Sequence, residues 1–317
     1  MKQSRYTEYT ERTPRLARAE HERPPKEPLW PTLLGLILGA AIILALAFLW
    51  YFPSLRERGQ GSAAVDATTP PSTAADVSAD RQTQSTGTSR APDKRTYRYY
   101  IDPETYMVKS MGEATSEVVF FTFNDAPAEY AVAMAELMRD NDCRAVFFAN
   151  GNYITTDEQR ARLKKLYDMG FEIGNQTLDH PHLRELSYTE KRDQIVGLSD
   201  QIEAITGERP RFFRPPYGEY DAETARICAE ENLILMTWTF GYDWREEYRE
   251  VDALTEILLN NEYLYGGANI LMHDNERVYR ALPALIEGYR AKGYTIVDPA
   301  EIMDYAATAE WLKGRQE

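Results

Sequence analysis

Two patterns of apolar residues divide this chain into an N-terminal and a C-terminal part. Residues 29–52 form an apolar run without a charged side chain, which is longer than the roughly 20 residues that a helix needs to cross a bilayer. Beyond about Thr96, short apolar runs alternate with segments whose apolar residues recur every three or four positions, as in buried strands and amphipathic helices. The first pattern predicts a transmembrane helix, and the second predicts a folded domain at 96–317.

The folded domain is expected to alternate strands with helices. The strands are expected at 117–123, 144–149, 171–174, 210–213, 233–239, 268–272 and 294–297. The helices are expected at 128–141, 156–169, 188–206, 221–231, 251–261, 276–292 and 299–309. Two of them begin with capping-box spacing, Thr155 with Glu158 and Ser187 with Glu190. Strands joined by helical crossovers pair in parallel, so the pattern predicts an α/β fold, and seven units favour a closed or nearly closed barrel.

The apolar run at 29–52 is flanked unequally by basic residues. Seven Lys or Arg side chains precede it, whereas Arg56 and Arg58 follow it closely, which predicts a cytoplasmic segment at 1–28. A cleavable signal peptide is the alternative, but its apolar region would span only about 7–15 residues. We therefore expect a single-pass membrane anchor with the C-terminal domain outside the cell. Gly35 and Gly39 have the spacing that seats a helix dimer, with chance occurrence as the alternative.

Composition predicts a linker between the anchor and the domain, and it argues against some classes of function. Residues 59–94 contain no Leu, Ile, Met, Phe, Tyr or Trp, so 53–95 is expected to be a disordered linker. The net charge of −14 repels phosphate backbones and argues against nucleic-acid binding. Only Cys143 and Cys228 occur, which excludes a scaffold built on disulfides and favours two buried thiols.

Polar side chains gather where the expected strands end. In barrel enzymes the active site lies on the loops after the C-terminal ends of the strands. Three of the four histidines fall on these loops. The chemically capable residues there are Asn124, Asp125, Gln176, Asp179, His180, His182, Arg214, Tyr217, Asp243 and His273. This convergence predicts an active or binding site on one face of the domain.

Five motifs at these strand ends resemble the polysaccharide deacetylase family, also called the NodB-homology domain or carbohydrate esterase family four. They are TFNDAP at 122–127, GNQTLDHPHL at 174–183, FRPPYGEY at 213–220, WTFGYDW at 238–244 and ILMHD at 270–274. The resemblance covers about 117–304. It implies a deformed (β/α) barrel that hydrolyses acetyl groups from chitin-like glycans, peptidoglycan or xylan with a divalent metal, usually zinc.

The resemblance assigns the metal and the base to particular positions. The ligand positions match Asp125, Gln176 and His180, and such a site leaves room for a water molecule that the metal activates. The general base matches Asn124, and Arg214 matches the arginine that pairs with this base.

The resemblance also assigns the general acid and the oxyanion donor, and the aromatic residues near them are candidates for sugar binding. The general acid matches His273, oriented by Asp243, and the backbone N–H of Tyr217 matches the oxyanion donor. For His273, a purely structural pairing with Asp243 is the alternative. The candidate sugar-binding aromatics are Tyr217, Trp238, Trp244 and Tyr220.

Two of these positions depart from the family pattern. The amide of Asn124 cannot accept a proton near neutral pH, and loss of a general base costs about 10²–10⁴ in rate. Gln176 offers only a neutral carbonyl oxygen, a weaker zinc ligand than imidazole. His182 and Asp179 are candidate substitute ligands.

Two hypotheses follow for the function. The first is a hydrolase of carbon–nitrogen bonds that deacetylates an N-acetylated cell-wall or surface glycan with weakened metal chemistry. The second is an inactive family member that binds the glycan in the same groove. The metal content of the purified domain discriminates between them, because the first mechanism requires bound zinc or another divalent metal.

Overall fold

The computed structural model describes residues 96–315 of the chain. The expected cytoplasmic segment 1–28, the transmembrane segment 29–52 with Gly35 and Gly39, and the whole linker 53–95 lie outside the described residues. Among the helices that are described, none has the length and apolar character needed to cross a membrane.

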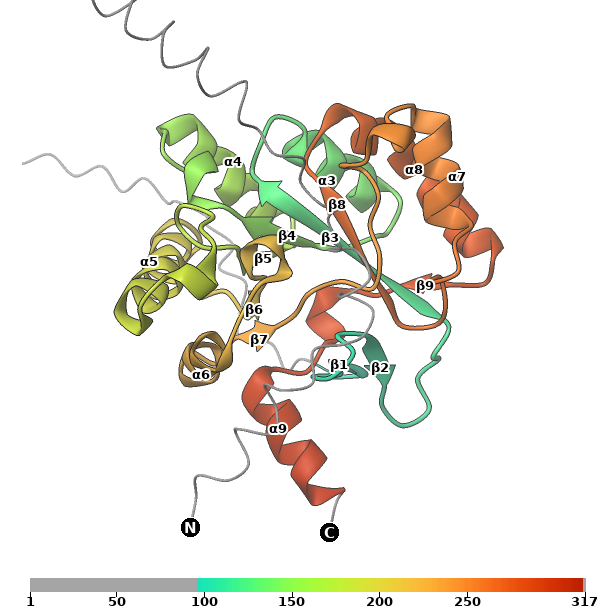
Figure 1. Ribbon diagram of the computed structural model, residues 1–317. Coiled ribbons are helices and arrows are strands. Elements are labelled where there is room, and N and C mark those ends of the chain that lie inside the picture. The colour runs from blue at the N-terminus through green and yellow to red at the C-terminus, as the bar shows by residue number, and fades with distance from the viewer. Residues whose placement is uncertain (1–95, 316–317) are drawn as a thin grey trace, which may run out of the picture. The chain divides into compact units, whose positions relative to one another are not determined.

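A curled sheet of seven parallel strands forms the centre of the described domain (Figure 1). The strands are β3 (Val118–Ala126), β4 (Val146–Ala149), β5 (Glu172–Asn175), β6 (Phe212–Phe213), β7 (Ile234–Leu235), β8 (Ala268–His273) and β9 (Thr295–Ile296). Their order is β7-β6-β5-β4-β3-β8, and β9 pairs with the start of β3. Each strand falls within or overlaps one expected range, and the parallel pairing confirms the predicted α/β fold.

The sheet curls toward closure because the chain after β7 returns to β8. The backbone N–H of Thr239 donates to the carbonyl of Asn269 at 2.8 Å, and that of Leu271 donates to the carbonyl of Phe240 at 2.9 Å. The expected strand at 233–239 is therefore regular for only two residues before it crosses to the far edge. The architecture is a curled, barrel-like sheet.

Helices cover the outside of this sheet (Figure 1). They are α3 (Ala131–Asp140), α4 (Asp157–Asp168), α5 (Tyr188–Thr206), α6 (Ala222–Glu230), α7 (Val251–Leu259) and α8 (Glu276–Ala291). The capping box of Ser187 and Glu190 is confirmed. The one expected at Thr155 and Glu158 is wrong by one residue: Thr156 caps α4, because the Gln159 side chain reaches back to its N–H.

The end of the chain differs from the expected helix at 299–309. Pro299–Glu301 is a single 3-10 turn capped by Asp298, and α9 (Tyr305–Gly314) begins only after it. The intervening residues are extended because Met303 donates its N–H to the carbonyl of Tyr99 at 2.8 Å.

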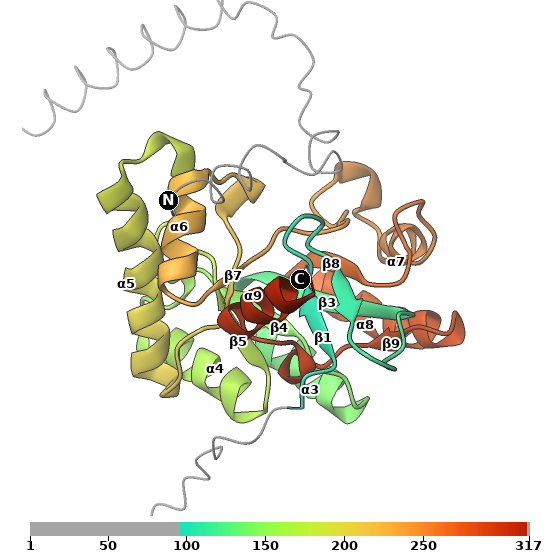
Figure 2. The same cartoon turned by 90° about the horizontal axis from the view of Figure 1, so that it is seen from below.

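A short antiparallel hairpin, which the sequence did not predict, precedes the barrel. It consists of β1 (Tyr99–Ile101) and β2 (Val108–Ser110). Hydrogen bonds from Val108 to Gly267, and from Gly267 to Val118, place it at the N-terminal ends of β3 and β8. Figure 2 shows β1 and α9 together at this end of the domain. The opposite end of the sheet is left to the candidate site.

Aromatic side chains fill the core between the sheet and the helices. Phe123 and Phe147 stack at 4.9 Å, and Phe121 meets Tyr289 of α8 edge-on at 5.6 Å. Cys143 and Cys228 are both buried, as expected for two thiols that belong to the core.

Candidate active site

The C-terminal ends of the strands bring most of the predicted site residues together. Asn124 and Asp125 are the two residues before the last residue of β3, Gln176 directly follows β5, and Arg214 directly follows β6. His273 is the last residue of β8. Because neighbouring parallel strands end at the same edge of a sheet, these side chains share one face of the domain.

Gln176 links the two other predicted metal ligands through hydrogen bonds. Its Oε1 accepts the backbone N–H of Asp125 at 3.1 Å, and its Nε2 lies 3.2 Å from Nε2 of His180. The Asp125 N–H fixes the oxygen end of the amide, so the amide nitrogen faces the imidazole and donates to it. Burial lowers the pKa of His180, which favours the neutral ring that accepts such a bond. The ring nitrogen that would bind a metal is therefore already bonded.

Arg214 is fully buried beneath Asn124 and pairs with no carboxylate of residues 96–315. Its Nη1 donates to Oδ1 of Asn124 at 3.0 Å, and its guanidinium lies 4.2 Å from the ring centre of Phe148. Further acceptors are Thr122 Oγ1, the Thr237 carbonyl and Asn269 Oδ1. Its Nε has no partner among the described residues. Burial lowers the pKa of Arg214 to about 9, because no nearby anion compensates the charge.

His273 and Asp243 form an intact pair. Nδ1 of His273 lies 2.9 Å from Oδ1 of Asp243, and the backbone N–H of His273 donates to Oδ2 at 2.8 Å. Asn275 also donates to Oδ2, at 3.1 Å. Burial lowers the pKa of His273, but the negative charge of Asp243 and the hydrogen bond to it outweigh burial and raise this pKa overall. The pair thus has the geometry of an oriented general acid.

Aromatic rings stand exposed beside this pair. Trp244 is 47% exposed, and its ring meets Trp238 and His273 edge-on at 6.3 and 5.7 Å. Tyr217 is 43% exposed and lies edge-on to His180 at 4.8 Å. The predicted groove residue Tyr220 is directed elsewhere, because its hydroxyl bonds that of Tyr106 in the turn between β1 and β2.

Comparison with known proteins indicates the same family that the five motifs resemble. The sequence pattern of the family described as polysaccharide deacetylase matches residues 111–233. The peptidoglycan-N-acetylglucosamine deacetylase of Bacillus cereus is 26% identical over 215 residues, which cover 66% of this chain and 76% of that protein. The described domain is thus similar to the polysaccharide deacetylase family, most directly over residues 111–233.

Two further similar proteins are informative. The uncharacterized protein YlxY of Bacillus subtilis is 31% identical over 195 residues, which cover 61% of this chain but only 59% of YlxY. A solved CE4 family pseudoenzyme from Bacillus anthracis matches with a TM-score of 0.54 and 28% identity, over 60% of this chain and 66% of that one. A mutant of this pseudoenzyme is described as having restored enzymatic activity.

The residues present do not fit the divalent metal that the deacetylase family implies. Gln176 is neutral, and its hydrogen bond occupies the ring nitrogen of His180. Within residues 96–315, no three His, Cys, Asp or Glu side chains come together as a group that could hold a metal ion. Asp125 and His180 alone fall short of the three protein ligands of a catalytic zinc site.

The two candidate substitute ligands have other partners. Oδ2 of Asp179 accepts a hydrogen bond from Gln194 at 2.7 Å. Nδ1 of His182 lies 2.9 Å from Glu219, and the ring of His182 stacks on Tyr217 at 4.2 Å. Both side chains therefore already have hydrogen-bond partners other than Asp125 and His180.

Two amides that the sequence reasoning missed support the site from below. Nδ2 of buried Asn150 donates to Oδ1 of Asp125 at 2.9 Å. Nδ2 of Asn269 donates to the carbonyl of Thr237 at 2.8 Å, while its Oδ1 accepts from Arg214. Asn150 directly follows β4, so its place at a strand end was a signal that could have identified it.

Proposed function

We propose that this chain binds an N-acetylated cell-wall or surface glycan at the strand ends without hydrolysing its acetamide groups. The observation that carries the proposal is the amide bridge of Gln176, which joins Asp125 and His180 where the family would hold a metal. A binding role needs the groove, whereas hydrolysis also needs an activated water molecule.

The two halves of the predicted reaction centre have diverged to different degrees. The half that activates water has lost its base at Asn124 and one ligand at Gln176. The half that protonates the leaving amine keeps His273 oriented by Asp243. Since general-base help alone is worth about 10²–10⁴ in rate, the first loss is sufficient to make turnover very slow.

The surface of the groove supports glycan as the ligand. The exposed rings of Tyr217 and Trp244 offer flat apolar surface next to hydrogen-bonding groups, a combination suited to an amphipathic ligand such as a sugar. Relatives include deacetylases of peptidoglycan and of chitin, both polymers of N-acetylated sugars.

The location of the domain belongs to the same proposal. A single-pass anchor at 29–52, with a cytoplasmic N-terminus, would place the domain in the cell envelope on the linker at 53–95. The apolar run and its basic flank support this arrangement. A helix dimer through Gly35 and Gly39 would put two grooves on one glycan.

A weakened deacetylase is the second candidate function, favoured by the intact pair of His273 and Asp243.

One experiment distinguishes glycan binding without hydrolysis from weakened deacetylation. The full-length protein in detergent is titrated with chitotetraose by calorimetry, and acetate release is measured on the same sample. We expect binding with no acetate release, and loss of binding in Trp244→Ala but not in the control Tyr265→Ala, whose ring is also exposed. Absence of chitotetraose and peptidoglycan binding would refute the proposal.

Zinc content provides the second readout. After dialysis against a mild chelator, we expect the wild type to keep well under one zinc per chain, since even indirect changes at metal sites cost about 10–100-fold in affinity. Gln176→His should retain zinc, whereas Gln176→Leu, which breaks the amide bridge without adding a ligand, should not. Stoichiometric zinc in the wild type would instead support the weakened deacetylase.

A further inference from the structure

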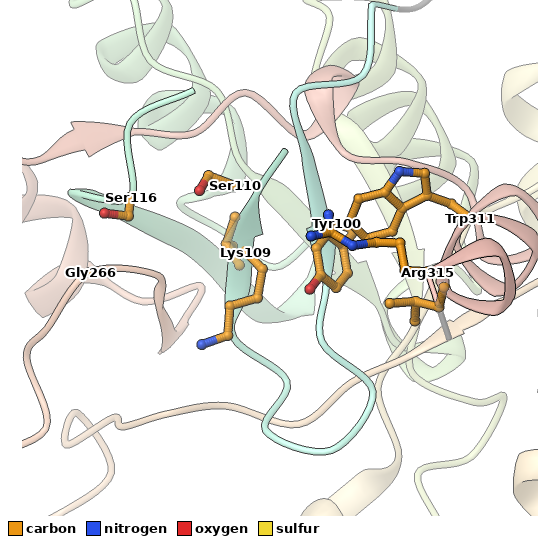
Figure 3. Close-up of a pocket in the computed structure, with 9 residues that line it drawn as sticks. Tyr100, Lys109, Ser110, Ser116, Gly266, Trp311 and Arg315 are labelled. Atoms are coloured by element: carbon orange, nitrogen blue, oxygen red, sulfur yellow. The ribbon is translucent and has the colours of Figure 1, made fainter. Parts of the chain in front are cut away.

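A cleft lies at the end of the domain opposite the candidate active site (Figure 3). It encloses about 400 Å³, within the range of roughly 300–1,000 Å³ typical of small-molecule sites. Its walls come from β1, β2, the loop before β3, the loop before β8, and α9. The side chains that give it chemical character are Tyr100, Lys109, Ser110, Ser116, Trp311 and Arg315.

Two aromatic rings form one wall of this cleft. Tyr100 and Trp311 pack at 5.0 Å with their planes inclined by 54°, and the guanidinium of Arg315 lies 4.7 Å from the Trp311 ring centre. In Figure 3, Tyr100 lies between Lys109 and the pair of Trp311 and Arg315. A half-buried aromatic wall with cations at both sides suits a ligand that is partly apolar and partly charged.

The two cations of the cleft are not neutralised by the domain itself. Neither Lys109 nor Arg315 forms an ion pair with another residue in the described part of the chain. The whole chain carries a net charge of −14, so a cleft lined by two unpaired cations has the opposite sign of charge to the chain as a whole. Together with the hydroxyls of Ser110 and Ser116, they offer charge-assisted hydrogen bonds to an anion.

The opposite wall is held closely in place by backbone contacts. A Cβ atom at Gly266 would lie 2.4 Å from the carbonyl oxygen of Ser116, so only glycine allows the two loops to approach this closely. The backbone carbonyl of the next residue, Gly267, accepts a hydrogen bond from the N–H of Val108, and its N–H donates to the carbonyl of Val118. The cleft is therefore preformed, which lowers the cost of ordering it around a ligand.

We propose that this cleft binds a sugar carrying a carboxylate or phosphate group, as a second glycan site separate from the groove. An anionic membrane surface is the competing ligand for the same cations. It is disfavoured because exposed acidic residues lie in the segments that form the cleft, Glu104 in the β1–β2 turn and Glu113 and Glu117 between β2 and β3, and an anionic leaflet would repel them. A single acidic group inside the cleft meets Lys109 and Arg315 without that repulsion. Two sites on one domain would add avidity for a charged polymer.

The test measures binding of matched charged and neutral sugars to the full-length protein in detergent. The probes are trigalacturonate with its neutral methyl ester, and glucose 6-phosphate with glucose, titrated by calorimetry or NMR. We expect at least one acidic probe to bind about tenfold or more tightly than its neutral counterpart, with affinity falling as salt is raised. An excess of chitotetraose should not displace it.

Matched variants assign the binding to the cleft. Lys109→Gln and Arg315→Gln should each weaken the acidic probe about tenfold, whereas Lys313→Gln, on the same helix but outside the cleft, should leave its affinity unchanged. Equal binding of the acid and its ester, or no effect of either variant, would overturn the proposal. So would displacement by chitotetraose, or binding to phosphatidylglycerol vesicles with none to the soluble acids. These outcomes do not depend on whether the groove binds glycan.

Discussion

The guanidinium of Arg214 donates to Oδ1 of Asn124 at 3.0 Å in a fully buried position. An arginine that would pair with a carboxylate in the family therefore faces a neutral amide here. Asn124 has nearly the shape of the expected aspartate, but it can neither accept a proton from water nor neutralise the charge of Arg214. These two losses make separate predictions, one for catalysis and one for stability.

The first prediction is that acetate release returns only when both substituted positions are restored. Asn124→Asp supplies a base, and Gln176→His supplies a third ligand and removes the amide bridge to His180. Each change alone should raise acetate release from chitooligosaccharides or peptidoglycan by less than about tenfold. The double variant should exceed the product of the two single effects, as for residues that act as one unit.

Two outcomes would contradict this prediction. A wild type as active as the double variant would show that the chemistry uses other residues. A double variant that binds zinc but releases no acetate would show that the groove has diverged as well, which favours a binding role.

The second prediction concerns stability. Asn124→Asp should raise the free energy of unfolding at pH 7 by about 3 kcal/mol, because it gives the buried Arg214 a counter-charge. Arg214 should lower the pKa of the new carboxyl below the usual ~3.9. The gain should therefore be complete above about pH 4 and disappear as the pH falls through the lowered pKa.

Urea unfolding of both proteins at pH 7 and at pH 3 measures this gain. The control is Asn152→Asp, which makes the same chemical change at an exposed site and should alter stability by less than about 0.5 kcal/mol. An unfolding free energy unchanged by Asn124→Asp at pH 7 would mean that Arg214 is already neutralised in another way.

The third prediction is that two histidines of the site titrate in opposite directions. Burial lowers the pKa of His180, whereas the partner Asp243 raises that of His273. NMR titration should place these values below and above the usual ~6.5, respectively. Because the folded pKa of His273 is raised, its contribution to stability is complete below about pH 6.5 and is lost as the pH rises through the folded value.

Asp243→Asn identifies the cause of the upward shift. The variant should lower the pKa of His273 below 6.5, because burial then acts without the opposing charge. If His273 still titrates above 6.5 in this variant, the charge of Asp243 is not the cause.

The fourth prediction tests topology. The linker contains Arg81 and Arg90, so trypsin added outside intact cells or protoplasts should release a fragment that begins within 59–94. Replacing both by Gln should slow that release. Digestion only after lysis would show that the orientation is wrong.

Much of the fold could be predicted because the central strands and most helices have clear apolar periods. The β1 and β2 hairpin was missed because strands of three residues are too short to show alternation. The last helix was misplaced because Pro299 resembles a helix start, whereas the pairing of Met303 with Tyr99 keeps the following residues extended.

The residues of the candidate site could be predicted from the sequence, but the hydrogen bonds between them could not. The motifs located Gln176 and His180, yet the bridge between them depends on how two loops meet, which the sequence does not show. Tyr220 looked like a groove residue because it follows Tyr217 in one motif. Its hydroxyl bond to Tyr106 depends on the hairpin that was itself missed.

The first and last elements of the described domain are neighbours. Tyr100 of β1 packs against Trp311 of α9, and Arg98 pairs with Glu301. A reporter protein or affinity tag fused directly behind α9 would therefore start near β1, at the end of the domain opposite the candidate active site. The same closeness makes the domain suitable for circular permutation, with new ends cut into a surface loop and the old ones joined by a short peptide.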